Sequence, residues 1–179
     1  MSPPFRAGER VSLRALEITD VPKLQGWVND PEVTQYVLSG RRPVNAIREM
    51  EWIQKLYTND EDVVFAIVKN DGGEHIGICG LHQMGPIDRF GVAGIIIGEP
   101  SLWGQGFGTE AMRLLIAHGF DVLNLHRIEL AVYENNPRAM KSYTKLGFVE
   151  EGRLRQKRFK NGRWLDEVIM SILRTEWRT

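Results

Sequence analysis

The sequence is poor in the residues that stabilise many small secreted and metal-binding proteins. Its 179 residues include a single cysteine, Cys79, so no internal disulfide can form. The four histidines, His75, His82, His118 and His126, show no ligand spacing with that cysteine. We therefore expect neither a disulfide-bonded scaffold nor a bound metal, and the chain must fold around an apolar core.

The sequence also lacks an excess of charge of either sign and a long apolar run. Lys and Arg together number 23, as do Asp and Glu, so the chain has no basic field for nucleic acid. Its apolar runs, such as residues 63–68, are far shorter than the ~18 residues of a membrane helix, and residues 1–6 lack the apolar core of a signal peptide. We expect one cytoplasmic domain over residues 1–179, with neither nucleic acid nor a membrane as partner.

Apolar periodicity predicts an alternation of strands and helices along the chain. Strand patterns cover residues 10–16, 63–68, 75–82, 92–97 and 127–132, and the Asn161-Gly162 turn predicts a hairpin of residues 148–158 and 163–173. Helical spacing covers residues 19–27, 45–57, 108–123 and 137–146. The order β-α-α-β-β-β-α-β-α-β-β predicts an α/β (α+β) protein with a mixed sheet.

Two of these patterns also predict burial. In the helix over 45–57, Ile47, Met50, Ile53 and either Leu56 or Tyr57 recur at helical spacing, which indicates an apolar face. The strand over 92–97 is an uninterrupted apolar run, which is typical of a strand that is covered on both faces.

A glycine-rich segment follows this apolar strand. Gly104, Gly106 and Gly108 alternate along a turn that leads into the next predicted helix. Glycine permits a positive φ and leaves room for an anion, and N–H groups at a helix N-terminus attract phosphate. No Lys-Ser or Lys-Thr pair directly follows these glycines, so a Walker A loop is not supported. Their spacing also differs from the Gly-x-Gly-x-x-Gly fingerprint, so a Rossmann site is not supported. A pyrophosphate site and a simple turn both stay open.

The neighbouring residues favour a pyrophosphate site. The segment Trp103-Gly104-Gln105-Gly106-Phe107-Gly108 resembles the coenzyme A pyrophosphate loop of the GNAT superfamily of N-acetyltransferases, whose pattern is Arg/Gln-x-x-Gly-x-Gly/Ala. Trp103 stands where Arg or Gln is most usual. Residues 136–148 are similar to the family's Asn-x-x-Ala-x-x-x-Tyr-x-Lys-x-Gly-Phe block. Residues 13–15 and 161–170 are similar to the branch that contains ribosomal-protein N-terminal acetyltransferases and spermidine N-acetyltransferases.

The resemblance implies a fold with a splayed central sheet and an acetyl-CoA-dependent enzyme. Such an enzyme transfers an acetyl group to a primary amine by direct attack in a ternary complex, and the amine could belong to a protein N-terminus, a polyamine or another small molecule. A noncatalytic coenzyme A-binding sensor or assembly module on the same fold is the alternative. A homodimer is also expected, since related folds often associate through the terminal hairpin or the sheet edges.

The resemblance further implies which residues bind acetyl-CoA. Backbone N–H groups from about Leu102 to Thr109 would face the pyrophosphate, and the backbone of Ile95 and Ile97 would pair with the pantetheine amides. The implied cofactor-binding residues are Ile95, Ile97, Trp103, Gly104, Gln105, Gly106, Phe107, Gly108, Thr109, Asn136, Ala139 and Tyr143. Asn136 precedes Pro137 and is also an ideal helix N-cap, so capping and cofactor contact both explain it.

Tyr143 and Glu99 are the expected catalytic residues. By resemblance, the Tyr143 hydroxyl would protonate the departing thiolate; the alternative is an aromatic residue that only packs in an amphipathic helix. A phenol has a pKa of ~10 and a thiol ~8.5, so this transfer must be nearly concerted with thiolate release. Glu99 is expected to remove the amine proton, with Glu134, His82 and water as further candidates.

The acceptor is expected to bind at residues 29–42, the second helix and the terminal hairpin. Glu32, Glu49 and Glu51 would attract a cationic amine, whereas Arg41 and Arg42 would bind an acidic acceptor. The sequence does not decide between these charges.

The terminal hairpin carries a basic run over residues 153–163. RNA binding and a contact with the 3′-phosphate of coenzyme A are both conceivable there. No aromatic-rich RNA-binding motif accompanies the charges, so we interpret the run as a solvated face.

Overall fold

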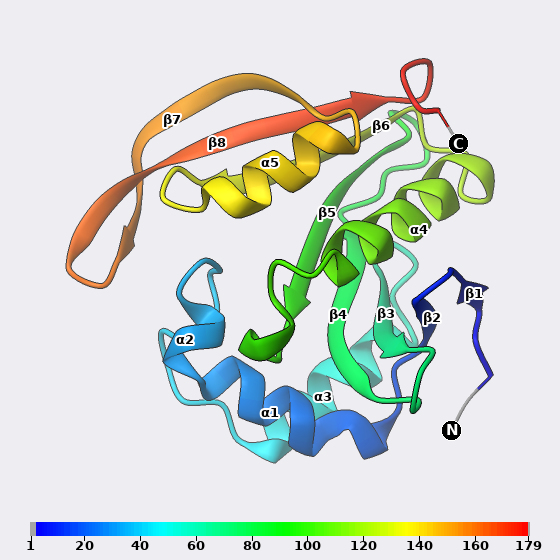
Figure 1. Ribbon diagram of the computed structural model, residues 1–179, viewed down its shortest axis with the longest axis vertical. Helices are drawn as coiled ribbons and strands as arrows, with labels where there is room; N and C mark the ends of the chain where they lie inside the picture. Colours follow the sequence, from blue (N-terminus) through cyan, green and yellow to red (C-terminus); the bar gives the residue numbers. More distant parts are fainter. Residues whose placement is uncertain (1–2, 179) are drawn as a thin grey trace.

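A computed structural model describes residues 3–178, and its eight strands form one sheet (Figure 1). The order across the sheet is β1-β2-β3-β4-β5-β6-β8-β7, and the paired neighbours are antiparallel except for β5 and β6. The strands are β1 (Arg6–Ala7), β2 (Val11–Ala15), β3 (Val63–Lys69), β4 (His75–His82), β5 (Phe90–Ile97), β6 (Arg127–Tyr133), β7 (Val149–Lys160) and β8 (Arg163–Leu173). The mixed sheet predicted from the sequence is confirmed.

Within residues 3–178, five α-helices and two 3-10 helices connect the strands. They are η1 (Ile18–Asp20), α1 (Val21–Asn29), α2 (Pro31–Thr34), α3 (Ala46–Leu56), η2 (Pro100–Leu102), α4 (Phe107–Asp121) and α5 (Pro137–Lys145). The sequence did not predict β1, η1, α2 or η2, because elements of two to four residues are too short to show a period. No helix within residues 3–178 is long and apolar enough to span a membrane.

Alternating side chains divide the core between the two faces of the sheet. On β3, Phe65 and Ile67 belong to the cluster that packs against α4, whereas Ala66 belongs to the cluster under α1 and α3. On β5, Ile95 and Ile97 face the α4 side and Ile96 faces the other. Both faces of β5 are therefore covered, as its apolar run predicted.

The buried face of α3 differs from the predicted one. Ile53 is fully buried, but Ile47 is 66 % exposed and Met50 is 37 % exposed. Glu49 is buried instead, and burial raises the pKa of its carboxyl group. The helix is rotated relative to the predicted stripe, because Ile53 and its neighbours Trp52 and Leu56 pack against α1 and β3.

The sheet is splayed between its two parallel strands. β5 pairs with β6 only from Phe90 to Val92, opposite Arg127 to Glu129. Beyond Val92 the strands diverge, since β6 continues to Tyr133 in register with β8 while β5 continues to Ile97 in register with β4. The splayed sheet expected from the resemblance is present, and it opens a gap between β5 and β6.

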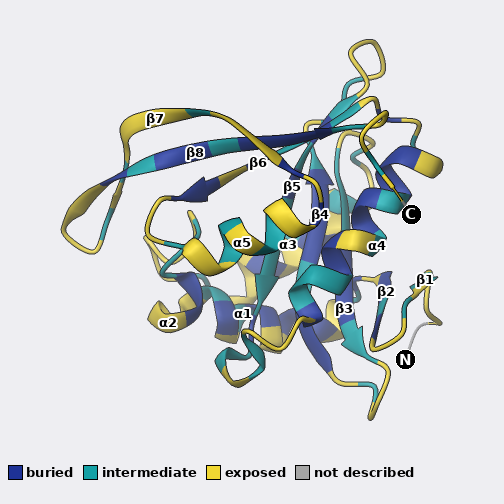
Figure 2. Ribbon diagram, turned by 45° about the horizontal axis from the view of Figure 1, so that its top comes forward, coloured by how far each residue is buried: buried dark blue, intermediate teal, exposed yellow. Residues whose placement is uncertain are grey.

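The β7–β8 hairpin is long and bent, and its tip lies near α2 (Figure 1). Its turn residues Asn161 and Gly162 have φ angles of 50° and 77°, as an Asn-Gly hairpin turn requires. The register shifts between Leu154 and Arg158, and such an irregularity bends a strand. Most of β7 is exposed along the edge of the sheet (Figure 2).

The basic run on this hairpin is not simply a solvated face. Arg158 donates from Nε to the buried Glu167 at 2.6 Å. Lys160 donates from Nζ to the carbonyl oxygens of Val37 at 3.2 Å and Ser39 at 2.9 Å. The prediction of a uniformly solvated face was therefore wrong for Arg158 and Lys160, whose partners come from β8 and from the segment after α2.

A buried ion pair joins β2 to the start of α1. Arg14 makes two hydrogen bonds of 2.8 Å to the Asp20 carboxylate, and His75 Nδ1 lies 3.1 Å from Asp20 Oδ1. Burial acts to raise the pKa of Asp20, but the hydrogen bonds from Arg14 and His75 outweigh it and hold that pKa well below its usual range. The charged form of Asp20 therefore stabilises the folded state.

We predict that Asp20→Asn lowers the free energy of unfolding by about 3 kcal/mol near neutral pH, because it leaves Arg14 buried without its counter-charge. The native pKa of Asp20 lies below its unfolded value of about 3.9, so the wild-type advantage is complete above about pH 4 and declines as the pH falls further. Urea unfolding at several pH values measures this difference. Asp88→Asn, at an exposed loop position, is the matched control. Equal stability of Asp20→Asn and wild type near pH 7 would contradict the prediction.

Candidate functional site

The glycine-rich loop before α4 presents a row of unpartnered backbone donors. Gly104 and Gly106 have φ angles of 77° and 90°, and Gly106 is the N-cap of α4 without a capping side chain. Within residues 3–178, no hydrogen-bond acceptor lies on the N–H groups of residues 104–109. Six consecutive unpartnered N–H groups therefore lie at the positive end of the α4 dipole, an arrangement that binds phosphate.

This row of donors is shorter than the sequence predicted. The N–H groups of Leu102 and Trp103 donate to the carbonyl oxygens of Glu99 and Pro100 in the η2 turn. They are therefore not available to a ligand, and the phosphate cradle, which we define as the N–H groups of residues 104–109, begins at Gly104.

Trp103 fastens the loop to the end of β5. Its indole Nε1 donates to the carbonyl oxygen of Ile97 at 2.8 Å. The guanidinium carbon of Arg138, in the first turn of α5, lies 4.4 Å from the centre of the Trp103 ring. The tryptophan that replaces the usual Arg or Gln thus holds the loop in place and positions a cation beside it.

Arg10 supports the cradle from the N-terminal side, and no motif or periodicity in the sequence predicted this role. Its Nη1 donates to the carbonyl oxygen of Gln105 at 2.7 Å, and its guanidinium carbon lies 4.1 Å from the centre of the Phe107 ring. Glu110 Oε1 accepts from the N–H groups of Arg10 and Val11. Because the Phe107 side chain is buried in the core, only its backbone can reach a ligand.

The backbone of Ile95 and Ile97 faces the gap between β5 and β6. Gly98 N–H donates to the carbonyl oxygen of Ile76 on β4 at 2.9 Å. In an antiparallel pair every second residue bonds the same neighbour, so Ile96 bonds β4 while the N–H and C=O groups of Ile95 and Ile97 point the other way. β5 pairs with β6 only as far as Val92, and the carbonyl oxygen of Ile97 already accepts from Trp103, so the N–H groups of Ile95 and Ile97 and the carbonyl oxygen of Ile95 stay available. An extended ligand can therefore pair with β5 here.

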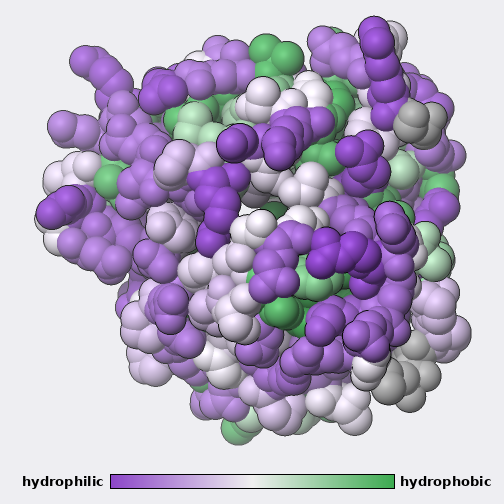
Figure 3. Space-filling model, viewed as in Figure 1, coloured by the Kyte–Doolittle hydropathy of each residue, from purple (hydrophilic) through white to green (hydrophobic). Residues whose placement is uncertain are grey.

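The first turn of α4 is joined to the second turn of α5, and the start of α5 is capped. Asn136 Oδ1 accepts from Ala139 N–H at 3.2 Å, which confirms that Asn136 caps α5. The hydroxyl groups of Thr109 and Ser142 lie 2.7 Å apart. On the face shown in Figure 3 the surface is hollowed near its centre, where α5 and the loop before α4 lie in Figure 1.

Tyr143 lies on α5 with its ring packed on the core and its hydroxyl group unpartnered. The ring centre is 5.9 Å from that of Phe148. Among residues 3–178 nothing hydrogen-bonds the hydroxyl group, and burial raises its pKa to about 12. The hydroxyl group therefore keeps its proton at neutral pH, as a proton donor must.

Glu99 follows β5 directly and is held from the α1 side. Its Oε1 accepts from Trp27 Nε1 at 3.2 Å and lies 4.0 Å from Lys23 Nζ. Trp27 packs so closely that a Cβ on Gly98 would lie 2.0 Å from its ring. The glycine before Glu99 therefore makes room for Trp27, and no register shift accompanies it in the pairing of β4 with β5.

The two further candidates for the base are held elsewhere. Glu134 Oε1 accepts from the N–H of Asp166 on β8 at 2.9 Å. His82 is the last residue of β4, which pairs with β5 on the side away from the gap. Its Nδ1 lies 3.2 Å from Asp62 Oδ1.

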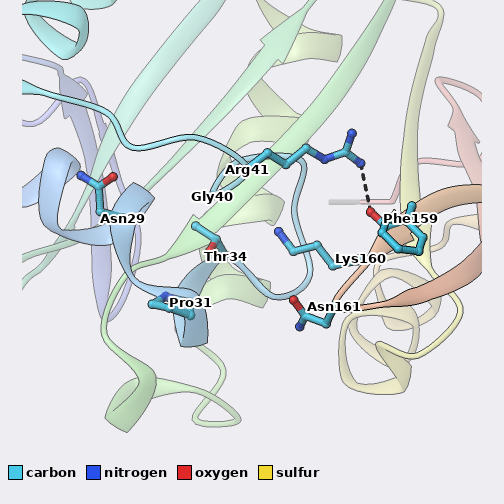
Figure 4. Close-up of a pocket in the computed structure, with 8 residues that line it drawn as sticks. All are labelled: Asn29, Pro31, Thr34, Gly40, Arg41, Phe159, Lys160 and Asn161. Carbon is cyan, nitrogen blue, oxygen red and sulfur yellow. Dashed lines mark hydrogen bonds between the residues drawn. The ribbon is translucent and has the colours of Figure 1, made fainter.

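A pocket of about 340 Å³ lies between the α1–α2 region and the tip of the hairpin (Figure 4). The residues that line it are Asn29, Pro31, Thr34, Gly40, Arg41, Phe159, Lys160 and Asn161. Both segments were predicted to form the acceptor end. Of the charged residues considered for that role, Arg41 lines the pocket, while Glu32, Glu49, Glu51 and Arg42 do not.

Comparison with known proteins gives consistent matches over nearly the whole chain. Residues 10–149 match the family described as the acetyltransferase (GNAT) domain. The N-acetyltransferase p20 of Bacillus licheniformis is 34 % identical over 171 residues, covering 94 % of this chain and 96 % of that protein. The spermidine N(1)-acetyltransferase of Vibrio cholerae is 31 % identical over 168 residues, covering 94 % and 95 %.

A solved structure agrees with these matches. The spermidine N-acetyltransferase of Vibrio cholerae in complex with CoA and spermine superposes with a TM-score of 0.87 at 30 % identity, covering 94 % of this chain and 98 % of that one.

We predict that Gly106→Val and Gly108→Val each weaken coenzyme A binding by about tenfold or more. At Gly106 a branched side chain cannot adopt a φ of 90° without strain, and the N–H groups around it would reorient. At Gly108 the backbone is helical, and the new side chain would crowd Ile97, 3.5 Å from its Cβ, at the edge of the cradle.

Gly72→Val is the matched control, because Gly72 has a φ of 80° in a turn with open space around it. Gly72→Val should lower the free energy of unfolding by a similar amount and leave coenzyme A binding unchanged. Calorimetry on the folded variants measures the affinity. An unchanged affinity in both cradle variants would show that the loop does not bind the pyrophosphate.

Proposed function

The chain belongs to the GNAT family of acetyltransferases, and we propose how its own residues perform the reaction of that family. It is an acetyl-CoA-dependent enzyme that transfers an acetyl group to a primary amine. The observation that carries the proposal is the gap between β5 and β6, which ends beside six unpartnered N–H groups. Donor and acceptor would meet in this gap.

The cradle would bind the pyrophosphate of acetyl-CoA without any charged side chain. The N–H groups of Gly104 to Thr109 suit two phosphates, and the α4 dipole adds to their attraction. From there the pantetheine arm would run along β5 and pair with the backbone of Ile95 and Ile97. Asn136 and Ala139 would lie along the same arm at the start of α5.

The chemical step requires an oxyanion donor and two proton transfers. The amine nitrogen attacks the thioester carbon, and a backbone N–H in the gap stabilises the developing oxyanion. The C–S bond then breaks, and the thiolate takes the proton of the Tyr143 hydroxyl group. Because that hydroxyl group has a pKa of about 12, its proton moves only as negative charge develops on sulfur.

Glu99 is the proposed base. Its carboxylate is half exposed at the end of β5, and the Trp27 indole occupies only one of its oxygens. The other oxygen can accept the amine proton directly or through a water molecule. Lys23 Nζ lies 4.0 Å from the oxygen that Trp27 contacts, so it leaves the other oxygen open.

The proposal also includes one domain over residues 1–179, a cytoplasmic location and a homodimer. A single sheet that runs from β1 to β7 supports the single domain. The exposed edge of β7, which carries the exposed apolar residues Val149, Leu154 and Phe159, supports association of two copies.

We predict that Tyr143→Phe lowers kcat by ~10²-fold or more, the scale of a positioned proton donor. The KM for acetyl-CoA should change little, because the ring, its contact with Phe148 and the cradle remain. The melting temperature should also hold, since the hydroxyl group has no hydrogen bond to lose. Steady-state release of coenzyme A with an amine measures the effect. Normal turnover in Tyr143→Phe would leave Tyr143 a packing residue.

We predict that Glu99→Gln lowers kcat/KM by about tenfold or more near neutral pH, because the amide accepts from Trp27 but cannot take a proton. The deficit should shrink as the pH approaches the amine's own pKa of about 10, where the amine is deprotonated in solution. Glu134→Gln is the control and should behave as wild type. A pH-independent effect of Glu99→Gln would indicate a structural role.

A noncatalytic sensor on the same fold would behave differently from this enzyme. It would bind coenzyme A with the same cradle, yet it would release no thiol when an amine is added. The assay of Tyr143→Phe includes the wild-type protein as its reference, so it also measures whether the wild type releases coenzyme A when an amine is added.

A further inference from the structure

The acceptor pocket is a basic pocket. Arg41 and Lys160 are the charged residues among its lining, and no described carboxylate lines it. They reach it from two segments that lie far apart in the sequence, the loop after α2 and the tip of the hairpin (Figure 4). The Asn161 side chain adds a neutral hydrogen-bonding group, whereas the amide of Asn29 and the hydroxyl hydrogen of Thr34 are already bonded to backbone atoms.

Neither cation has a counter-charge among residues 3–178. Lys160 donates to two carbonyl oxygens, and Arg41 makes one long bond of 3.4 Å to the carbonyl oxygen of Phe159. Burial and the positive charge of Arg41 lower the pKa of Lys160, so the two cations are close enough to repel. An anion between them would relieve that repulsion and fill the free donors of Arg41.

The pocket adjoins an element that packs on the end of β5, because Asn29, which lines it, follows two residues after Trp27, whose ring packs on Gly98. Tyr133 is the last residue of β6, and its buried hydroxyl group has no hydrogen-bond partner in the described chain. Burial raises the pKa of this hydroxyl group, whereas the positive charges of Arg158 and Arg41 act to lower it. Arg41 therefore lies near the end of β6, one of the two strands that bound the gap. Glu167, opposite Tyr133 on β8, already pairs with Arg158.

We propose that the acceptor is a primary amine that carries an anionic group, a carboxylate or a phosphate, and that Arg41 and Lys160 bind this group. The proposal rests on the proposed function, since the amine must reach the gap. A diamine or polyamine would instead place a second ammonium group beside two uncompensated cations. The chain then differs in acceptor charge from the relatives named for spermidine.

Matched acceptors test the charge preference of the wild-type enzyme. A series of ω-amino carboxylates is compared with α,ω-diamines and with ω-amino amides of the same chain length, and phosphoethanolamine and spermidine are added. Release of coenzyme A gives kcat/KM for each. We expect the anionic amines to exceed the diamines of equal length by roughly tenfold or more, and the amides to lie between them. Comparison of the ω-amino carboxylates with phosphoethanolamine identifies which anion is preferred.

Arg41 variants connect this preference to the pocket. Arg41→Gln should raise the KM of the anionic amines by roughly tenfold and that of the ω-amino amides by much less, while the KM for acetyl-CoA stays unchanged. Arg41→Glu should move the preference toward the diamines. Arg42→Gln is the matched control, because Arg42 is exposed next in the chain and does not line the pocket.

Two outcomes would overturn the inference. One is a wild-type preference for diamines or spermidine over the anionic amines, and the other is an unchanged preference in Arg41→Gln. Either result leaves acetyl transfer itself intact, because thiol is still released with an amine. Release of no thiol with any amine would contradict the proposed function, and the inference about the acceptor would fall with it.

Discussion

Incomplete pairing of two parallel strands is the constraint on which the rest of this structure depends. β5 and β6 share three residue pairs and then separate, because each is held in register by its other neighbour. A strand with one unpaired edge inside a sheet carries backbone groups that need a partner. At Ile95 and Ile97 those groups face the gap, so the donor substrate can take the place of a missing strand. The loop at residues 104–109 and the first turn of α5 lie at the end of that same gap.

Much of this arrangement follows from local sequence, and the part that does not depends on contacts between distant residues. The glycines at 104 and 106 imply a positive φ, and Asn136 before Pro137 implies a capped helix, because these are properties of one or two residues. The hydrogen bond from Arg10 to Gln105 joins residues that are 95 positions apart, so no periodicity or motif in the sequence reveals it. The face of α3 was also misjudged, because the neighbours that bury Glu49 are set by tertiary packing rather than by the helical period.

The two ends of the site use different electrostatics. The cradle attracts phosphate with neutral N–H groups and a helix dipole, which cost little to bury and are fixed by the backbone. The acceptor pocket uses whole charges on the flexible side chains of Arg41 and Lys160. Fixed partial charges suit a donor that is always the same, whereas side-chain charges can be reversed by a single substitution. The two motifs that the sequence analysis recognised lie at the donor end of the site.

The contact of Lys160 with Val37 and Ser39 closes the pocket by joining two segments that lie some 120 positions apart. Neither segment contributes to the cradle, so either wall can change in length or composition without disturbing the donor loop. The proposed acyl-donor site and the proposed acceptor site therefore use different parts of the chain. The donor would bind to the middle of the chain, and the acceptor to the loop after α2 and the hairpin tip. New acceptors can then arise through changes at the hairpin tip or in the loop after α2, at small risk to the chemistry.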